Sequence, residues 1–191
     1  MGNILQVDVA GTPQEWITPL QAATIICSGN VSWSTGQTIT TLTGGRSRFT
    51  GLPSTLDIPA IIATKGVARI NLLNLEPALT RHNDKLFERD RHVCAYCGNV
   101  FKREDLTREH IHPVSKGGKD AWMNVVTACK DCNWSKADLP LEKTGMSLLY
   151  LPYIPNRYED FLLQRGSKKI LADQMDFLLE KVPRNSRLRV N

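Results

Sequence analysis

The stretch that decides the fold is Cys94–Asp138, CAYCGNVFKREDLTREHIHPVSKGGKDAWMNVVTACKDCNWSKAD. It contains two C-x-x-C pairs, Cys94/Cys97 and Cys129/Cys132, and this spacing lets both thiolates of a pair turn onto one ion. Four sulfur ligands suit tetrahedral zinc and leave no open position for water. We therefore expect a structural zinc held by these four cysteines.

The segment between the two cysteine pairs is longer than a simple zinc module requires. It spans 31 residues, whereas the pairs of a zinc ribbon are separated by about 15–20. A Glu-His pair is followed there by a proline and a Gly-Gly turn, and two asparagines come later. The candidate residues for chemistry are Glu109, His110, Asn124 and Asn133.

On these residues the segment resembles the HNH endonucleases of the ββα-metal class, in the subset with a four-cysteine zinc support. The resemblance covers about residues 80–145. It implies an α+β fold with a ββα-metal module, and hydrolysis of DNA to 5′-phosphate and 3′-hydroxyl ends. The chain departs from the family pattern at Glu109, where Asp is commoner, and at Asn133, where the last His usually stands. It is therefore an H-N-N variant.

The resemblance implies a role for each candidate residue. His110 is the general base, Glu109 and Asn133 bind a catalytic Mg²⁺ or Mn²⁺, and Asn124 ties the loop together and so holds His110. The chemistry agrees, because phosphodiester hydrolysis needs a base and a cation held by oxygen ligands. Carboxylate and amide oxygens suit such a hard ion. His112, two residues after His110, competes with it for the role of base.

Glu109 and His110 are consecutive on a predicted strand, which sets a geometric condition on the site. Consecutive side chains of a strand point to opposite faces. One of the two must therefore turn toward the metal while the other faces water and substrate.

The charge distribution permits binding to nucleic acid. The formal net charge is +5, and residues 181–191 contain four basic residues and no acidic one. A basic tail can follow a phosphate backbone, and a lysine three residues after Asn133 shares its helix face. The predicted DNA-contacting residues are Lys116, Lys119, Lys136, Arg187 and Arg189.

Three parts are expected along the chain: an N-terminal α+β extension over 1–79, the HNH domain over 80–150, and a C-terminal helical segment with a basic tail over 151–191. The patterns predict a helix from residue 80, with Thr80 as its N-cap. Two further helical segments are predicted over 156–166 and 167–183.

Within the N-terminal extension we expect a strand over 4–9 and a helix over 18–29. Residues 31–50 are typical of short strands and turns, because β-branched residues alternate there and are interrupted by glycines. Residues 56–73 are expected to form a helix or a strand. Cys27, the fifth cysteine, is interpreted as a small buried apolar side chain.

Composition excludes some classes of protein. No run of 18 apolar residues is present, so no membrane span is expected. The first residues lack the pattern of a secretion signal, and we expect a cytoplasmic protein, bacterial or phage-encoded. Whether it forms a homodimer stays open. The alternative to a nuclease is a non-catalytic, zinc-dependent DNA-binding or assembly module with a decayed HNH site, and an RNA-directed nuclease is a third reading.

Overall fold

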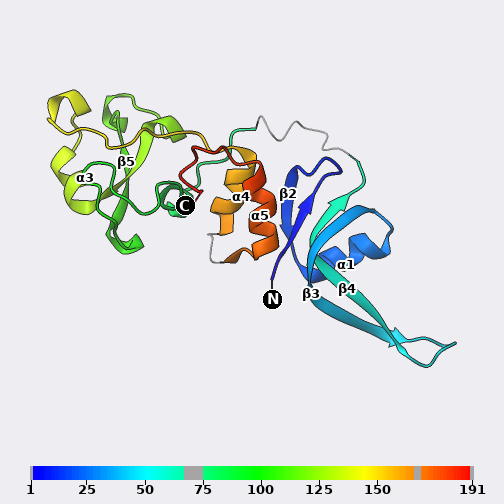
Figure 1. Cartoon of the computed structure of the whole chain (residues 1–191). Coiled ribbons are helices and arrows are strands. Elements are labelled where there is room, and N and C mark those ends of the chain that lie inside the picture. The colour runs from blue at the N-terminus through cyan, green and yellow to red at the C-terminus, as the bar shows by residue number, and fades with distance from the viewer. Residues whose placement is uncertain (1, 67–74, 166–168, 190–191) are drawn as a thin grey trace. The chain divides into compact units, whose positions relative to one another are not determined.

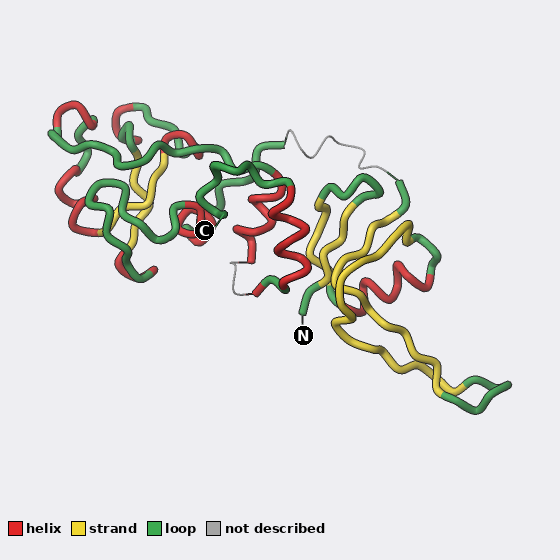
Figure 2. The backbone as a smooth tube through the Cα atoms, viewed as in Figure 1, coloured by secondary structure: helices red, strands yellow, loops and turns green. Residues whose placement is uncertain are grey.

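The computed structural model describes residues 2–66, 75–165 and 169–189 and divides the chain into two compact units. Unit 1 comprises Met1–Leu75 and Ser167–Lys181, and unit 2 comprises Glu76–Gly166 and Val182–Asn191. The C-terminal part of the chain is thus shared between the units, which differs from the three successive parts expected from the sequence. Figure 1 shows the elements along the chain, and Figure 2 shows the same backbone by secondary structure.

Unit 1 is built on a four-stranded sheet in the order β2-β1-β4-β3. β1 and β4 are parallel, and the other neighbouring pairs are antiparallel. The strands and helices of this unit are β1 (Ile4–Val7), β2 (Pro13–Ile17), α1 (Pro19–Cys27), β3 (Val31–Arg46), β4 (Pro53–Thr64) and α5 (Ala172–Glu180).

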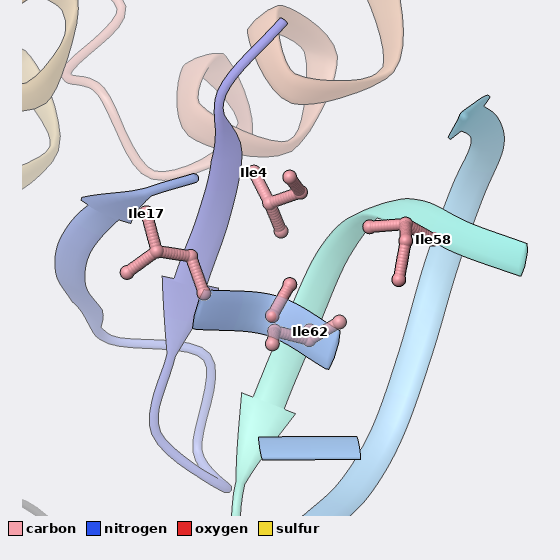
Figure 3. Close-up of a cluster of buried hydrophobic side chains, with 5 residues drawn as sticks. Ile4, Ile17, Ile58 and Ile62 are labelled. Atoms are coloured by element: carbon pink, nitrogen blue, oxygen red, sulfur yellow. The ribbon is translucent and has the colours of Figure 1, made fainter. Parts of the chain in front are cut away.

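The core of unit 1 is a cluster of aliphatic side chains between the sheet and α1. Ile4, Ile17, Ile58 and Ile62 point toward one another in Figure 3, and Ala22 of α1 completes the cluster. Burying each large aliphatic side chain contributes about 1.5–3 kcal/mol. This cluster accounts for the apolar pattern of the strands that carry it.

Helices at both ends of the chain belong to unit 1. Thr18 caps α1 in a capping box with Gln21, which fixes the start of that helix. In α5, the buried Gln174 donates hydrogen bonds to the carbonyl oxygens of Asn3 (2.8 Å) and Ala60 (2.9 Å). These bonds attach a C-terminal helix to the N-terminal sheet.

Three expectations for this unit need correction or completion. Residues 31–46 form one long strand, β3, because β4 pairs with it along its length despite the glycines. Residues up to 64 of the expected element 56–73 form a strand, and residues 67–73 lie outside the described residues. Cys27 is exposed, so its interpretation as a buried side chain is wrong.

Unit 2 contains a β-hairpin followed directly by a helix. β5 and β6 pair antiparallel, from Leu106 opposite Cys129 to His110 opposite Val125, and α3 packs against both strands. The predicted α+β fold with a ββα module is confirmed. The strands and helices of this unit are α2 (Asp84–Arg89), β5 (Leu106–His110), β6 (Val125–Cys129), α3 (Lys130–Lys136) and α4 (Arg157–Arg165).

A buried arginine links the segments of unit 2. Arg89 is fully buried, and its guanidinium pairs with Asp90 at 2.8 Å. It also donates to the carbonyl oxygens of Trp122 (3.0 Å), Val125 (2.8 Å) and Tyr153 (3.1 Å). The planar guanidinium can satisfy several acceptors at once, so one side chain joins α2, the hairpin and the segment before α4.

The start of α2 differs from the prediction. The helix begins at Asp84, after Asn83, and Thr80 donates its hydroxyl proton to the carbonyl oxygen of His82. The prediction of Thr80 as N-cap is therefore wrong. Among the helices of the described residues, none combines the length and the apolar character that a membrane crossing requires.

Candidate functional site

The four cysteines of unit 2 meet at the junction of β6 and α3. Their Sγ atoms all lie within 4.8 Å of one another, and Cys94 and Cys129 are buried. Tetrahedral zinc with Zn–S bonds of about 2.3 Å holds its sulfurs about 3.8 Å apart, so a small contraction closes the cluster on an ion. The residues fit a structural zinc.

Backbone hydrogen bonds hold the first cysteine pair against the hairpin. The Ala95 amide donates to the carbonyl oxygen of Thr127 on β6 (2.8 Å), and the Leu149 amide donates to that of Ala95 (2.8 Å). The turn that begins at Cys94 closes at Gly98, whose amide donates to the Cys94 carbonyl oxygen (3.0 Å). Gly98 has a φ of +75°, and a Cβ there would lie 3.0 Å from the Leu149 side chain. Residues near 149 are thus part of the cysteine module.

The electrostatic environment of the cysteines favours a bound cation. Burial acts to raise the pKa of Cys94, but backbone amides of Cys97, Cys129 and Tyr96 outweigh it and lower this pKa to about 7. Burial raises the pKa of Cys132, and the neighbouring cysteines raise it further. Neighbouring thiolates repel one another through their negative charges. The thiolate is the form that binds metal, so a zinc ion would offset this repulsion.

The helix-facing side of β5 carries Thr107 and Glu109, two residues apart as the strand period requires. The Asn133 side-chain amide of α3 donates to Thr107 Oγ1 at 2.8 Å. Lys136 Nζ, one helical turn later, lies 2.6 Å from Glu109 Oε1. β5 and α3 therefore bring both candidate metal ligands, Glu109 and Asn133, to the same interface.

The ion pair of Glu109 and Lys136 is almost completely buried. Lys136 is 0% exposed and Glu109 is 5% exposed, and Lys136 Nζ also donates to the His110 carbonyl oxygen (2.8 Å). Burial raises the pKa of Glu109, and the adjacent Lys136 opposes this shift. Lys136 was expected to contact phosphate, but its ammonium is enclosed within unit 2.

The opposite side of β5 carries Arg108 and His110, which share one carboxylate. His110 Nε2 lies 2.9 Å from Asp120 Oδ1, and Arg108 Nη1 donates to Asp120 Oδ2 at 2.6 Å. The His110 side chain is 24% exposed, so it is held by a hydrogen bond while remaining accessible. Glu109 thus faces α3 and His110 faces the loop, as alternation along the strand requires.

The loop after β5 is held by the side chain of Asn124. Its Nδ2 donates to the carbonyl oxygens of His112 (3.0 Å) and Lys119 (2.8 Å), and its Oδ1 accepts from the His112 amide (2.9 Å). Gly118 lies so close to this loop that a Cβ would be 1.9 Å from the His112 carbonyl oxygen. The backbone of the loop can therefore adopt this conformation only with glycine at position 118.

A pocket of about 210 Å³ opens beside the end of β5. Glu109 and His110 both line it, although they point to opposite faces of the strand. His112, the competing base, contacts the carbonyl oxygen of Lys116 through Nε2 (3.0 Å) and is not among the lining residues. The lining residues are Glu109, His110, Pro113, Val114, Ser115, Ala137 and Asp138.

The other predicted DNA-contacting residues differ in their surroundings. Lys116 and Lys119 are exposed on the loop beside the pocket. Arg187 instead stacks on Tyr150 at 3.9 Å and donates to the Leu151 carbonyl oxygen at 3.0 Å. Arg189 donates to the Val182 carbonyl oxygen. Arg187 and Arg189 are thus held by contacts within unit 2.

Sequence reasoning missed Asp120 and Thr107, the side-chain partners of His110 and Asn133. For Asp120 there was a weak signal, because Arg108 and His110 share a strand face and an acidic residue between the cysteine pairs could pair with them. No local pattern indicated Thr107. Trp134, which follows Asn133 on α3, is 85% exposed.

Comparison with known proteins agrees with this geometry. Residues 94–149 match the family model described as HNH endonuclease. This match spans the cysteine cluster, the ββα module and the pocket, so the resemblance identified from the sequence is confirmed for this segment. None of the curated proteins compared with the chain matches it.

Proposed function

We propose that unit 2 is a metal-dependent HNH endonuclease that hydrolyses DNA phosphodiester bonds, with His110 as the general base. The observation that carries the proposal is the shared pocket of His110 and Glu109, beside a helix that presents Asn133. A base and two oxygen ligands within one ββα module are the groups that phosphodiester hydrolysis requires.

The contact with Asp120 supports a role for each of the two ring nitrogens of His110. A carboxylate accepts a hydrogen bond from Nε2–H, which leaves Nδ1 as the nitrogen able to take a proton from water. The 2.9 Å contact between Nε2 and Asp120 Oδ1 supports this tautomer. Arg108, which donates to the other carboxylate oxygen, holds Asp120 in position.

Glu109 and Asn133 are the proposed ligands of the catalytic ion, Mg²⁺ or Mn²⁺. The NH₂ group of Asn133 donates to Thr107, and that bond leaves the amide oxygen as a ligand of the kind such ions prefer. When bound, the ion stabilises the leaving 3′-oxygen. Lys136 pairs with Oε1 of Glu109, so this carboxylate would bind the ion through its other oxygen.

The remaining residues of the site position these groups. Asn124 fixes the loop through three hydrogen bonds to the backbone. The loop in turn carries Asp120, which contacts His110. The zinc cluster secures the junction of β6 and α3, and so the distance from β5 to the helix that carries Asn133.

One observation favours a second candidate function, a non-catalytic zinc-dependent DNA-binding module. The buried ammonium of Lys136 neutralises Glu109 and occupies one side of its carboxylate. If that pair does not yield to a divalent ion, the pocket binds DNA without cutting it.

A plasmid-nicking assay separates the two functions. The zinc-loaded full-length chain is incubated with supercoiled DNA, with and without added Mg²⁺ or Mn²⁺, so that no chelator disturbs the zinc. The nuclease converts the plasmid only when the ion is added, whereas a binding module shifts the DNA and leaves it intact. His110→Ala is expected to lower cleavage by at least about 100-fold while zinc content and DNA binding stay unchanged.

The matched control for this variant is His112→Ala, which removes a neighbouring imidazole outside the pocket lining. It is expected to keep cleavage within a few-fold of the unsubstituted chain. Cleavage at full rate by His110→Ala would refute the assignment of the base.

A further inference from the structure

The hairpin of β3 and β4 in unit 1 extends past the part of the sheet that the core uses. β1 pairs with β4 only from Ile61 to Ala63, and the outermost side chains packed on the core are Leu42 and Leu56. Among the described residues, no third strand pairs with the hairpin beyond that point. Figure 2 shows the two strands continuing away from the sheet to a closed tip. We call residues 43–55 the arm.

The arm is a defined structure. At its tip the Ser47 amide donates to the Leu52 carbonyl oxygen (2.8 Å), and the Gly51 amide donates to that of Ser47 (2.9 Å). Ser47 Oγ accepts from the amides of Phe49 and Thr50. These bonds close the turn and hold Phe49 outward, where it is 100% exposed.

The chemistry of the arm is unusual for a solvent-exposed hairpin. Arg46 and Arg48 are its only charged residues, so the arm is basic. Phe49 and Leu52, 67% exposed, place apolar surface at the same tip. Such exposed side chains do not contribute to the hydrophobic core. Exposing apolar surface to water is unfavourable, so two such side chains at one tip indicate a binding surface.

We propose that the arm is a DNA-binding β-ribbon that enters a groove of duplex DNA, with Arg46 and Arg48 on the phosphates and Phe49 against the bases. A two-stranded ribbon fits the width of the major groove. The four residues of β3 in the arm, 43–46, give about 13 Å of reach at about 3.3 Å each, and the groove is about 8.5 Å deep. Apolar side chains of DNA-binding proteins can insert between base steps, as they do in proteins that bind the minor groove.

Charge selects this partner over another protein or a second copy of the chain. The two arginines complement a polyanion, and many of the remaining polar side chains of the arm are hydroxyls that can donate to phosphate oxygens. The inference rests on the proposed function for the choice of DNA, yet it concerns a surface of unit 1 and not the pocket of unit 2. It gives the N-terminal unit a role in substrate binding.

The test measures binding without cleavage. Full-length, zinc-loaded chain carrying His110→Ala is titrated into a fluorescently labelled duplex of about 30 base pairs without added Mg²⁺, and anisotropy is recorded at several salt concentrations. Adding Arg46→Ala and Arg48→Ala is expected to weaken binding about tenfold and to reduce the salt slope by about 2, because each phosphate contact contributes about 0.9.

Phe49 is tested by its effect on base stacking. Binding to a duplex with 2-aminopurine is expected to raise the probe's fluorescence, since an inserted ring unstacks the base. Phe49→Ala removes this signal and weakens binding about fivefold, whereas Phe49→Trp restores both. The matched control is Leu20→Ala, which removes an apolar side chain 71% exposed on α1 of the same unit.

The outcomes distinguish this inference from the proposed nuclease. If the arm variants bind DNA with unchanged affinity and salt slope, the arm is not a DNA-binding element. The same conclusion follows if Phe49→Ala instead changes the oligomeric state measured by sedimentation. A chain that loses affinity on arm substitution but never cleaves with Mg²⁺ or Mn²⁺ supports the arm and contradicts the nuclease. Cleavage that is unaffected by the arm variants, together with unchanged binding, contradicts the arm alone.

Discussion

Lys136 and Glu109 form an ion pair, 2.6 Å between Nζ and Oε1, in which the lysine is wholly removed from solvent and the glutamate nearly so. The pair joins α3 to β5 at the point where a catalytic ion is proposed to bind. A buried charge is stable only while its partner and its hydrogen bonds remain. This contact therefore stabilises the packing of α3 on β5 and is also part of the proposed site.

Replacing Lys136 by Ala is expected to lower the free energy of unfolding by about 3–5 kcal/mol, since it leaves a buried carboxylate without its partner. Urea denaturation of the zinc-loaded chain measures the change. The control is Lys130→Ala, an exposed lysine on the same helix, which is expected to change stability by less than about 0.5 kcal/mol.

The interaction energy of the pair is measured by a double-mutant cycle. The cycle compares the single variants Glu109→Gln and Lys136→Met with the double variant that carries both. The double variant is expected to lose less stability than the sum of the two single variants, because removing both charges leaves no unpaired one. Strict additivity would show that the two side chains do not stabilise each other.

Asp120→Ala is expected to reduce cleavage about 10–100-fold, which is the range typical for loss of the hydrogen-bond partner of a metal-binding side chain. The reason is that His110 loses the acceptor at Nε2. ¹⁵N NMR of the imidazole should show a fixed Nε2–H tautomer in the unsubstituted chain and a mixture in the variant.

Asp120→Glu, which retains the carboxylate, should recover part of the activity and of the tautomer signal. Asp105→Asn removes a carboxylate from an exposed turn of the same unit and serves as the control for charge. A cleaving Asp120→Ala variant with an unchanged NMR spectrum would exclude a positioning role.

Zinc removal is expected to unfold unit 2. Cys94→Ser removes one of four ligands whose sulfurs lie within 4.8 Å of one another, and the free energy of binding structural zinc is part of the free energy of folding. Zinc content by mass spectrometry should fall below one ion per chain, and the melting transition of unit 2 should disappear.

Cys27→Ser is the matched control, because Cys27 is exposed and lies in α1 of unit 1. It should leave zinc content and both melting transitions unchanged. A folded, zinc-free Cys94→Ser chain would overturn the structural role of the metal.

Gly118→Ala is expected to impair cleavage without releasing zinc. A Cβ at this position would lie 1.9 Å from the His112 carbonyl oxygen and 2.9 Å from that of Pro113, and backbone atoms cannot move aside cheaply. The loop that carries Asp120 must then shift. Gly29→Ala, at the end of α1 in unit 1, where a Cβ meets nothing within 4 Å, should cleave normally, and equal activity of both variants would contradict this account.

Part of the site was predictable because its information is local. A C-x-x-C pair fits within a single turn, so the zinc ligands follow from spacing alone. Glu109 and His110 were identified by their motif, and the strand period correctly required them to face opposite sides. The match over residues 94–149 confirms that this segment is similar to HNH endonucleases.

Other features were not predictable, because they depend on segments distant in the sequence. The partner of His110 is ten residues away in a folded loop, and the burial of Lys136 follows from how α3 packs on β5. The glycines of β3 indicated short strands, but pairing with β4 produced one long strand. Arg187 was expected at DNA, but tyrosine rings and a carbonyl group of unit 2 hold it.

The sequence by itself determined the zinc quartet, the ββα order of the central segment and the identity of the candidate base. The tertiary structure alone decided which carboxylate orients that base, that a lysine neutralises Glu109, and that the C-terminal part of the chain is divided between two units. The physical reason is that ligand spacing and strand alternation act over a few residues. Burial and charge pairing arise only when distant segments exclude water together.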